Sequence, residues 1–144
     1  MIDFLNQAKA DVDLALFKKI ALIILKDHNI DHKKYFLSVA FISPQEMKKV
    51  NKKYRKKNKP TDVISVELMD NKFNCNQNWL GEILICQKVV YQNSKKYGVT
   101  KKEEMIKVFI HGLLHVLGYD HENSEDQAKK MEKKEAFYFS KVRF

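Results

Sequence analysis

The sequence predicts an α+β fold: a small mixed β-sheet with about five α-helices packed on it. Segments with the composition of strands alternate with segments of helical period along the whole chain. The 144 residues suit one domain, and no Pro-, Gly- or Ser-rich linker divides them. Hydrophobic residues make up 44% of the chain, which is enough to form a core. We therefore expect residues 1–144 to form a single domain.

Four segments have the composition of strands. Met1–Gln7 is expected to form a short edge strand. Tyr35–Ile42 is aromatic and β-branched, which is typical of a mostly buried strand. Asp62–Leu68 alternates in polarity, and a polar loop separates it from the next strand, Leu80–Cys86. We expect these last two strands to pair in an antiparallel manner.

Helices are expected in five segments: Asp11–Lys26, Pro44–Asn58, Lys88–Tyr97, Thr100–Leu117 and a last one that starts at Ser124. The second helix has three start signals, because a capping hydroxyl, a Pro in the first turn and a Glu follow one another from Ser43. Its buried stripe is expected to be Met47, Val50 and Tyr54. Gly98 and Gly118 are expected to end the third and fourth helices.

The charge balance favours a polyanionic partner. The chain has 27 basic and 18 acidic residues, a formal net charge of +9, and such an excess is typical of nucleic-acid binding, although Lys can also serve only as a solubilising residue. Two cysteines exclude a disulfide scaffold and a Cys-rich zinc module. No apolar run approaches the ~18 residues of a membrane span, and no secretory signal begins the chain. We expect a cytoplasmic protein that binds no membrane.

Three histidines in one short segment indicate a metal site. His111 and His115 are four residues apart on the predicted fourth helix, so their rings share one face. Gly118 can reverse the chain, which brings His121 back toward that face. Three neutral imidazoles with one position left open are the ligand set of a catalytic zinc site. Zinc is the expected ion, although three imidazoles also accept nickel, copper or iron.

The same spacing occurs in metzincin proteases, which is the first alternative. In those enzymes a Glu serves as general base at the position that Gly112 occupies here, so a protease is disfavoured. The second alternative is a non-catalytic, zinc-containing RNA-binding module of ribosome assembly, with Asp120 as a fourth ligand. His28 and His32 lie in a polar turn and are expected at the surface.

Four blocks of the sequence resemble the YbeY family of bacterial endoribonucleases. His111–His121 is similar to its His-x-x-x-His-x-x-Gly-Tyr-Asp-His signature. Val50–Arg55 and Lys59–Ser65 resemble its Leu-Asn-x-x-Tyr-Arg and Pro-Thr-Asp-Val-Leu-Ser-Phe blocks, and Leu80–Ile83 resembles its Leu-Gly-Asp-Ile. The order of the blocks also agrees. Two departures, Val66 for the usual Phe and Glu82 for the usual Asp, are conservative in burial or charge.

The resemblance implies a metal-dependent endoribonuclease specific for single-stranded RNA. It would act in ribosomal RNA maturation, including the 3′ end of 16S rRNA, and in ribosome quality control. The implied cofactor is one divalent ion held by His111, His115 and His121. The implied partners are single-stranded or ribosomal RNA and the ribosome or its small-subunit assembly factors, and no DNA is expected.

Further site residues are expected around the metal. The predicted second helix carries a ridge of basic residues, and we expect Lys48, Lys52 and Lys56 to bind RNA phosphates. Arg55 is expected to be catalytic, because an Arg can hold two phosphate oxygens and neutralise developing charge; the family block places its functional Arg here. Asp120 is expected either to position a ligand histidine or the water, or to cap the Gly118 turn.

Overall fold

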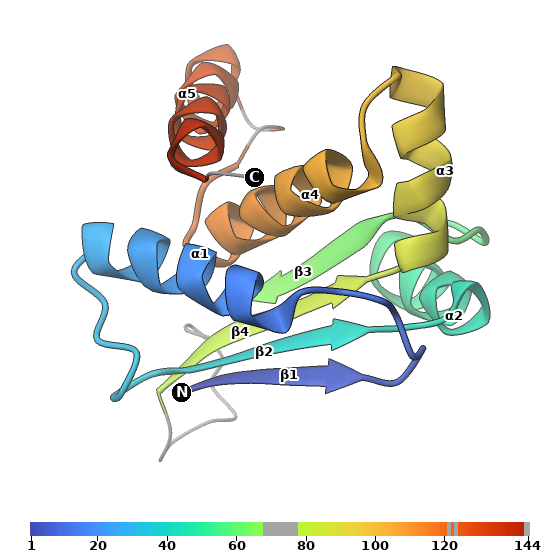
Figure 1. Cartoon of the computed structure of the whole chain (residues 1–144), viewed down its shortest axis with the longest axis horizontal. Coiled ribbons are helices and arrows are strands. Elements are labelled where there is room, and N and C mark those ends of the chain that lie inside the picture. The colour runs from blue at the N-terminus through green and yellow to red at the C-terminus, as the bar shows by residue number, and fades with distance from the viewer. Residues whose placement is uncertain (68–77, 121, 123, 143–144) are drawn as a thin grey trace.

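Four strands form one mixed sheet in the computed structural model, which describes residues 1–67, 78–120, 122 and 124–142 (Figure 1). The strands are β1 (Ile2–Asn6), β2 (Phe36–Phe41), β3 (Val63–Glu67) and β4 (Trp79–Ile85), in the order β1-β2-β4-β3. β2 is parallel to both β1 and β4, and β3 is antiparallel to β4. The predicted fold class, the edge strand and the antiparallel pair are confirmed; Leu68, at the end of the predicted third strand, lies outside the described residues.

Five helices accompany the sheet within the described part of the chain. They are α1 (Leu14–Asp27), α2 (Pro44–Arg55), α3 (Gln87–Tyr97), α4 (Lys101–Val116) and α5 (Glu125–Lys141). The side chains of Ser43, Thr100 and Ser124 each accept a hydrogen bond from a backbone N–H three residues later, at 3.2, 3.0 and 3.1 Å. These caps confirm three of the predicted helix starts. No helix in the described ranges is long and apolar enough to cross a membrane.

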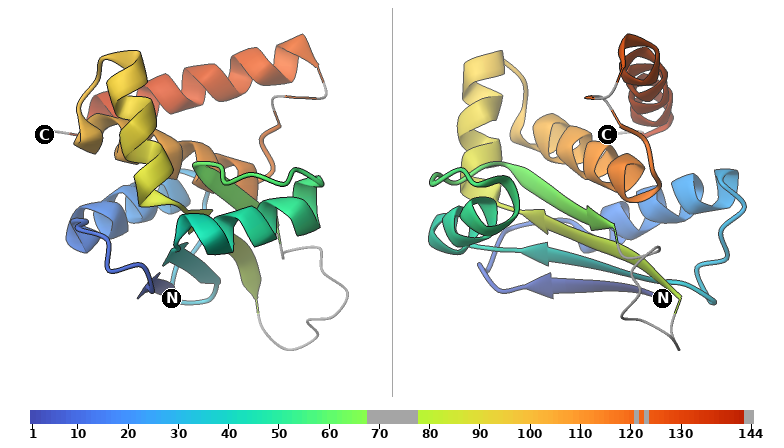
Figure 2. Two further views of the ribbon diagram at one scale, coloured as in Figure 1. Left: turned by 90° about the vertical axis from the view of Figure 1, so that its right-hand side faces the viewer. Right: turned by 180° about the vertical axis from the view of Figure 1, so that it is seen from behind.

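The helices divide between the two faces of the sheet. α1 and α4 lie on one face, with α5 on the outer side of α4, and α2 lies on the other face (Figure 2). Successive side chains of β2 point to opposite faces of the sheet, so the strand contributes to both helix layers. Leu37, Val39 and Phe41 join the large core with α1 and α4. Ala40, between them, joins a smaller core with Met47 of α2. The sheet therefore carries a helix layer on each side.

Helix α2 is shorter and less buried than the sequence predicts. It ends at Arg55 because Lys56 takes the left-handed conformation, with φ of 58°. Tyr54, predicted in the buried stripe, is 53% exposed. The buried residue after Met47 is instead Asn51, whose Nδ2 donates a hydrogen bond to the Lys59 carbonyl at 2.7 Å. This bond ties the end of α2 to the segment that enters β3.

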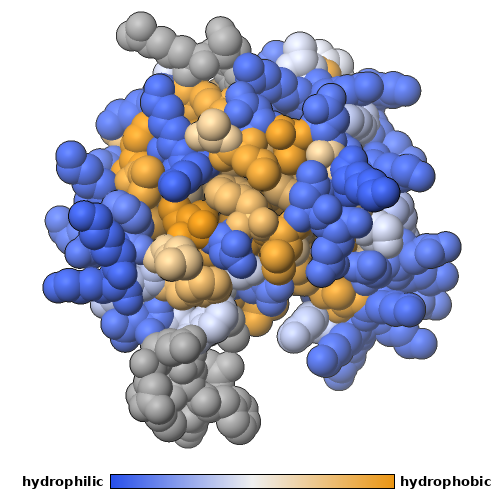
Figure 3. All heavy atoms as spheres, turned by 60° about the horizontal axis from the view of Figure 1, so that its bottom comes forward, coloured by the Kyte–Doolittle hydropathy of each residue, from blue (hydrophilic) through white to orange (hydrophobic). Residues whose placement is uncertain are grey.

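On the face of the molecule shown in Figure 3, below the sheet, hydrophilic side chains surround a group of apolar ones. Two of the large exposed apolar side chains, Met1 and Leu5, lie at or beside edge strand β1 and are 67% and 42% exposed. The site described next lies elsewhere, between α4, β3 and α2.

Candidate active site

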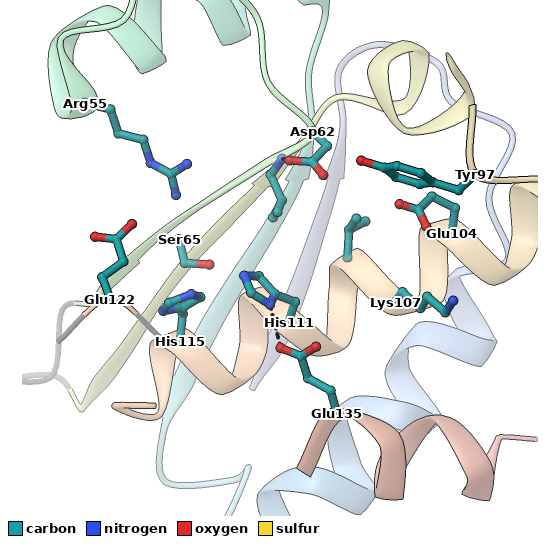
Figure 4. Close-up of a pocket in the computed structure, with 12 residues that line it drawn as sticks. Arg55, Asp62, Ser65, Tyr97, Glu104, Lys107, His111, His115, Glu122 and Glu135 are labelled. Atoms are coloured by element: carbon teal, nitrogen blue, oxygen red, sulfur yellow. Dashed lines mark hydrogen bonds and ion pairs between the residues drawn. The ribbon is translucent and has the colours of Figure 1, made fainter. Parts of the chain in front are cut away.

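A cleft of about 500 Å³ lies between α4, the start of β3 and the end of α2. The lining side chains in the described part of the chain come from all three elements and from α3, α5 and the turn after α4 (Figure 4). They are Arg55, Asp62, Val63, Ser65, Tyr97, Glu104, Lys107, Val108, His111, His115, Glu122 and Glu135. Two of the three predicted metal ligands and the predicted catalytic arginine therefore share one cavity.

His111 and His115 lie together on the face of α4 that lines the cleft. Their ring centroids are 4.6 Å apart and their planes are inclined by 76°, as four-residue helical spacing predicts. Nδ1 of His111 lies 2.6 Å from Oε1 of Glu135, which comes from α5, 24 residues later. In the neutral ring this Nδ1–H donates to the carboxylate, so Nε2 is the nitrogen that would bind a metal.

Glu135 is a site residue that the sequence did not identify. The sequence places it on one side of the last helix with Ala128 and Met131, and Met131 is buried in the core. An acidic residue at helical spacing from Ala128 and Met131 is the sequence signal that could have identified it. A carboxylate that accepts from a ligand histidine fixes the ring tautomer and orientation, which is the usual support of a metal-binding imidazole.

Gly112 explains how α4 reaches the sheet. A Cβ at this position would lie 3.0 Å from Ile83 Cγ2 and 3.1 Å from Ser65 Oγ. The Ser65 hydroxyl donates a hydrogen bond to the Gly112 carbonyl at 2.9 Å. The glycine therefore allows close contact between α4 and strands β3 and β4, and a side chain at this position would require the Ile83 and Ser65 side chains to shift. This packing disfavours the metzincin alternative on structural grounds.

The turn after α4 reverses the chain as predicted. Gly118 has φ of 99°, which favours glycine. Oδ1 of Asp120 accepts a hydrogen bond from the Glu122 backbone N–H at 2.8 Å, so this carboxylate closes the turn. His121 lies outside the described residues, and within the described ones no group of three or more His, Cys, Asp or Glu side chains could hold a metal. Its role as third ligand and a role of Asp120 at the metal stay predictions.

His28 contacts this turn although it lies far from it in the sequence. It is half-buried, so its predicted surface position was wrong. Its Nδ1 lies 2.7 Å from the Ile24 carbonyl, which can only accept, so Nδ1 carries the proton. With that tautomer, Nε2 accepts from the Tyr119 hydroxyl at 2.9 Å. The end of α1 is thereby joined to the turn that leads to Asp120.

The basic residues in and directly after α2 differ in whether they line the cleft. Arg55, at the end of the helix, is exposed and lines the cleft opposite the histidines (Figure 4). It also lines an adjoining cavity of about 820 Å³ together with Asp120. Lys48, Lys52 and Lys56 are exposed and do not line either cavity. The structure thus brings Arg55 to the histidine pair and leaves the three lysines on the surrounding surface.

Two carboxyl groups lie at the other end of the cleft. Glu104 is only 7% exposed, and burial raises the pKa of its carboxyl; the negative charge of Asp62 adds to this, while Lys107 opposes it. Oδ1 of Asp62 accepts from the Val63 backbone N–H at 2.8 Å and from the Thr61 hydroxyl at 3.3 Å. No site role was predicted for Glu104; the available signal is an acidic residue directly before the apolar pair Met105 and Ile106.

Comparisons with known proteins show which family the chain resembles. The family model described as "Endoribonuclease YbeY" matches residues 3–143. A protein named Endoribonuclease YbeY from Thermodesulfovibrio yellowstonii is 39% identical over 126 residues, which cover 88% of this chain and 76% of that protein. A protein of the same name from Thermotoga neapolitana is 34% identical over 144 residues, which cover 99% of this chain and 89% of that protein.

A solved structure has a similar fold. The solution structure of protein TM1509 from Thermotoga maritima superposes with a TM-score of 0.68 at 31% sequence identity, and the match covers 96% of this chain and 87% of the other. The family match spans nearly the whole chain, including the paired histidines, the Gly118 turn and Arg55. The protein therefore belongs to the Endoribonuclease YbeY family.

Proposed function

We propose that the protein is a metal-dependent endoribonuclease that cleaves single-stranded RNA during ribosomal RNA maturation, including that of the 16S 3′ end, and in ribosome quality control. The observation that carries the proposal is that a histidine pair and an arginine lie on opposite sides of one cleft. His111 and His115, the first supported by Glu135, face the cationic end of α2 at Arg55. The protein would work in the cytoplasm, in contact with the ribosome or its small-subunit assembly factors.

The residues of the site suit a divalent ion such as Zn²⁺. Two imidazoles at helical spacing and a carboxylate that accepts from one of them are the chemistry of a histidine metal site. His111, His115 and His121 would hold the ion. A bound divalent ion supplies Lewis-acid polarisation of a phosphoryl oxygen at such a site.

The chain's own residues account for the remaining parts of the reaction. Arg55 would contact the scissile phosphate with two N–H groups and stabilise the charge that builds up on its oxygens. Lys48, Lys52 and Lys56 would hold the backbone on either side without reading bases. Asp120 would keep the turn, and with it His121, in place.

His115→Ala provides the test of this function. The variant should lose the metal, measured by elemental analysis, and cleavage of a single-stranded RNA, measured on gels with end-group analysis of the products. His32→Ala, a half-buried histidine outside the cleft, is the matched control and should keep both. Full metal occupancy in His115→Ala would contradict the ligand assignment, and RNA cleavage that persists without metal would contradict the metal dependence.

The same preparation separates the alternatives. A casein assay should show no proteolysis, because Gly112 provides no general base next to His111. Metal-loaded protein that binds single-stranded RNA without cleaving it would favour the non-catalytic assembly module. A double-stranded RNA of the same sequence should be cleaved more slowly than the single strand.

A further inference from the structure

The cleft extends past the histidines to a part that the proposed reaction does not use. Asp62 from the start of β3, Tyr97 from the end of α3 and Glu104 from the first turns of α4 line this end. Figure 4 shows the two carboxyl groups and the Tyr97 hydroxyl directed toward the same space. This end lies in the same cavity as His111, so a nucleotide next to the scissile bond can reach it.

The Glu104 side chain is largely buried, but its carboxyl lines the cleft. The residue is 7% exposed, and within the described residues no hydrogen bond or ion pair to its carboxyl is found. Lys107 attracts it electrostatically, but the Lys107 ammonium lies over the Phe139 ring, 5.3 Å from the centroid. Its two oxygens are therefore available to accept hydrogen bonds from a ligand in the cleft.

Asp62 is fixed in place beside it. Its Oδ1 is held by the Val63 backbone N–H and the Thr61 hydroxyl, and its negative charge contributes to the raised pKa of Glu104. The two carboxyl groups therefore face one small space from two different elements. Asp62 cannot rotate away without breaking both hydrogen bonds. The end of the cleft therefore presents carboxylate oxygens that can accept hydrogen bonds from a ligand.

Tyr97 supplies an apolar surface next to these acceptors. The side chain is 58% exposed although it lines the cleft. An exposed aromatic ring at the mouth of a cleft is suited to stack on the flat face of a base, and single-stranded RNA offers its bases unstacked. Lys96 lies 5.9 Å from the ring centroid and adds positive charge for the phosphate backbone at this mouth.

Two ligands could satisfy such acceptors, a metal cation or a nucleobase. A second cation is disfavoured, because Asp62 and Glu104 have no third acidic or histidine ligand among the described residues and Lys107 lines the same cavity. A base is favoured by the aromatic ring beside the carboxyl groups. Of the four bases, guanine offers two adjacent N–H donors on its Watson–Crick edge, N1–H and N2–H, which match the two oxygens of one carboxylate.

We propose that Tyr97, Glu104 and Asp62 form a nucleobase subsite that binds guanine next to the cleaved bond. Tyr97 stacks on the base, the Glu104 carboxylate accepts its two N–H donors, and Asp62 closes the edge of the subsite. The proposal rests on the proposed function, because it gives the endoribonuclease a base preference. The basic ridge would still contribute no sequence information.

The test compares RNA oligomers that carry one guanine with oligomers that carry inosine, adenine, cytosine or uracil at that position. Inosine lacks only the 2-amino group. Wild-type protein should bind and cleave the guanine oligomer about tenfold better than the inosine oligomer. Glu104→Gln should remove this difference, and the effects of the variant and of inosine should not add, because both break the same contact.

Matched variants separate this contact from a structural effect. Glu103→Gln makes the same change one residue earlier and keeps the capping box with Thr100, so it should retain the guanine preference. Tyr97→Ala should weaken binding of every oligomer about tenfold, whereas Tyr97→Phe, which keeps the ring, should not. Equal binding and cleavage of all five oligomers by wild-type protein would overturn the subsite.

Binding and cleavage readouts keep the two proposals apart. Anisotropy with labelled oligomers reports the guanine preference without any cleavage. A protein that prefers guanine but never cleaves retains the subsite and contradicts the endoribonuclease. A protein that cleaves all sequences equally retains the endoribonuclease and contradicts the subsite.

Discussion

Helices α4 and α2 contribute opposite sides of one cleft, yet they are held in different ways. Both begin with a hydroxyl cap. Ten of the 16 residues of α4 are buried, but only Met47 and Asn51 of the 12 in α2. The histidines are therefore fixed by the core, whereas Arg55 is placed by one buried amide and the left-handed Lys56. We therefore expect substitutions at the histidine side of the cleft, on α4, to change both the stability and the activity of the protein. Substitution of Arg55, at the end of α2, should change the activity alone.

Arg55→Ala should give the largest effect that leaves the fold intact. We expect kcat at saturating RNA to fall by about 100- to 1000-fold, because a charge-stabilising group is lost from the transition state. Metal content and melting temperature should not change. Arg55→Lys keeps the charge but not the two-pronged contact, so it should be impaired as well.

Lys53→Ala, on the exposed part of the same helix, is the control for Arg55→Ala and should keep nearly normal kcat. A raised KM with an unchanged kcat in Arg55→Ala would make this residue one more phosphate anchor. A lowered melting temperature of Arg55→Ala would contradict the expectation that substitutions at the end of α2 leave the stability unchanged.

Glu135→Gln tests the metal side through the hydrogen bond to His111. The carboxylate is replaced by a neutral amide, so the zinc affinity should fall by about 10- to 100-fold in a chelator competition. Glu132→Gln, exposed one turn earlier on α5, should leave it unchanged. Equal zinc affinity in both variants would show that the 2.6 Å contact does not support a metal ligand.

Reversing the charge of two lysines on α2 should change only RNA binding. In the double variant Lys48→Glu and Lys52→Glu, the slope of log affinity against log salt should flatten by about 1.4, since each phosphate contact contributes about 0.7 on single strands. The same reversals at Lys18 and Lys19, exposed on α1, serve as the control. An unchanged slope in the α2 variant would place the RNA elsewhere on the protein.

The pH dependence of stability should reveal the raised pKa of Glu104 on helix α4. The pKa of Glu104 is raised in the folded protein from 4.5, the ordinary pKa of a Glu carboxyl. The folded state therefore keeps this proton to a higher pH than the unfolded chain does. The contribution of Glu104 therefore falls as pH rises from 4.5 through the raised value. Relative to wild type, Glu104→Gln should gain melting temperature over this range, and Glu103→Gln should not. A constant difference across that range would contradict the raised pKa.

The sequence predicted those features that depend on local chemistry. Cap residues and alternating strands are read from neighbouring positions, so the order of elements, the antiparallel pair and the histidine spacing on α4 were correct. Tyr54 was misplaced because the burial of a residue in the last turn of a helix depends on where the sheet ends. Glu135 and the burial of Glu104 depend on contacts between distant elements, which periodicity alone cannot locate. The assignment of His121, outside the described residues, stays a prediction.

The packing at Gly112 has an evolutionary consequence. Metzincins share the histidine spacing of this chain and use a Glu where Gly112 stands. A Cβ here would lie 3.0 to 3.2 Å from side-chain atoms of Ile83, Ser65 and Val63, so these side chains would have to shift to admit a Glu. A single Gly112→Glu substitution would therefore strain the contact between α4 and the strands beneath it. Two chemistries that look one residue apart in sequence therefore also differ in how closely the histidine helix can pack against the sheet.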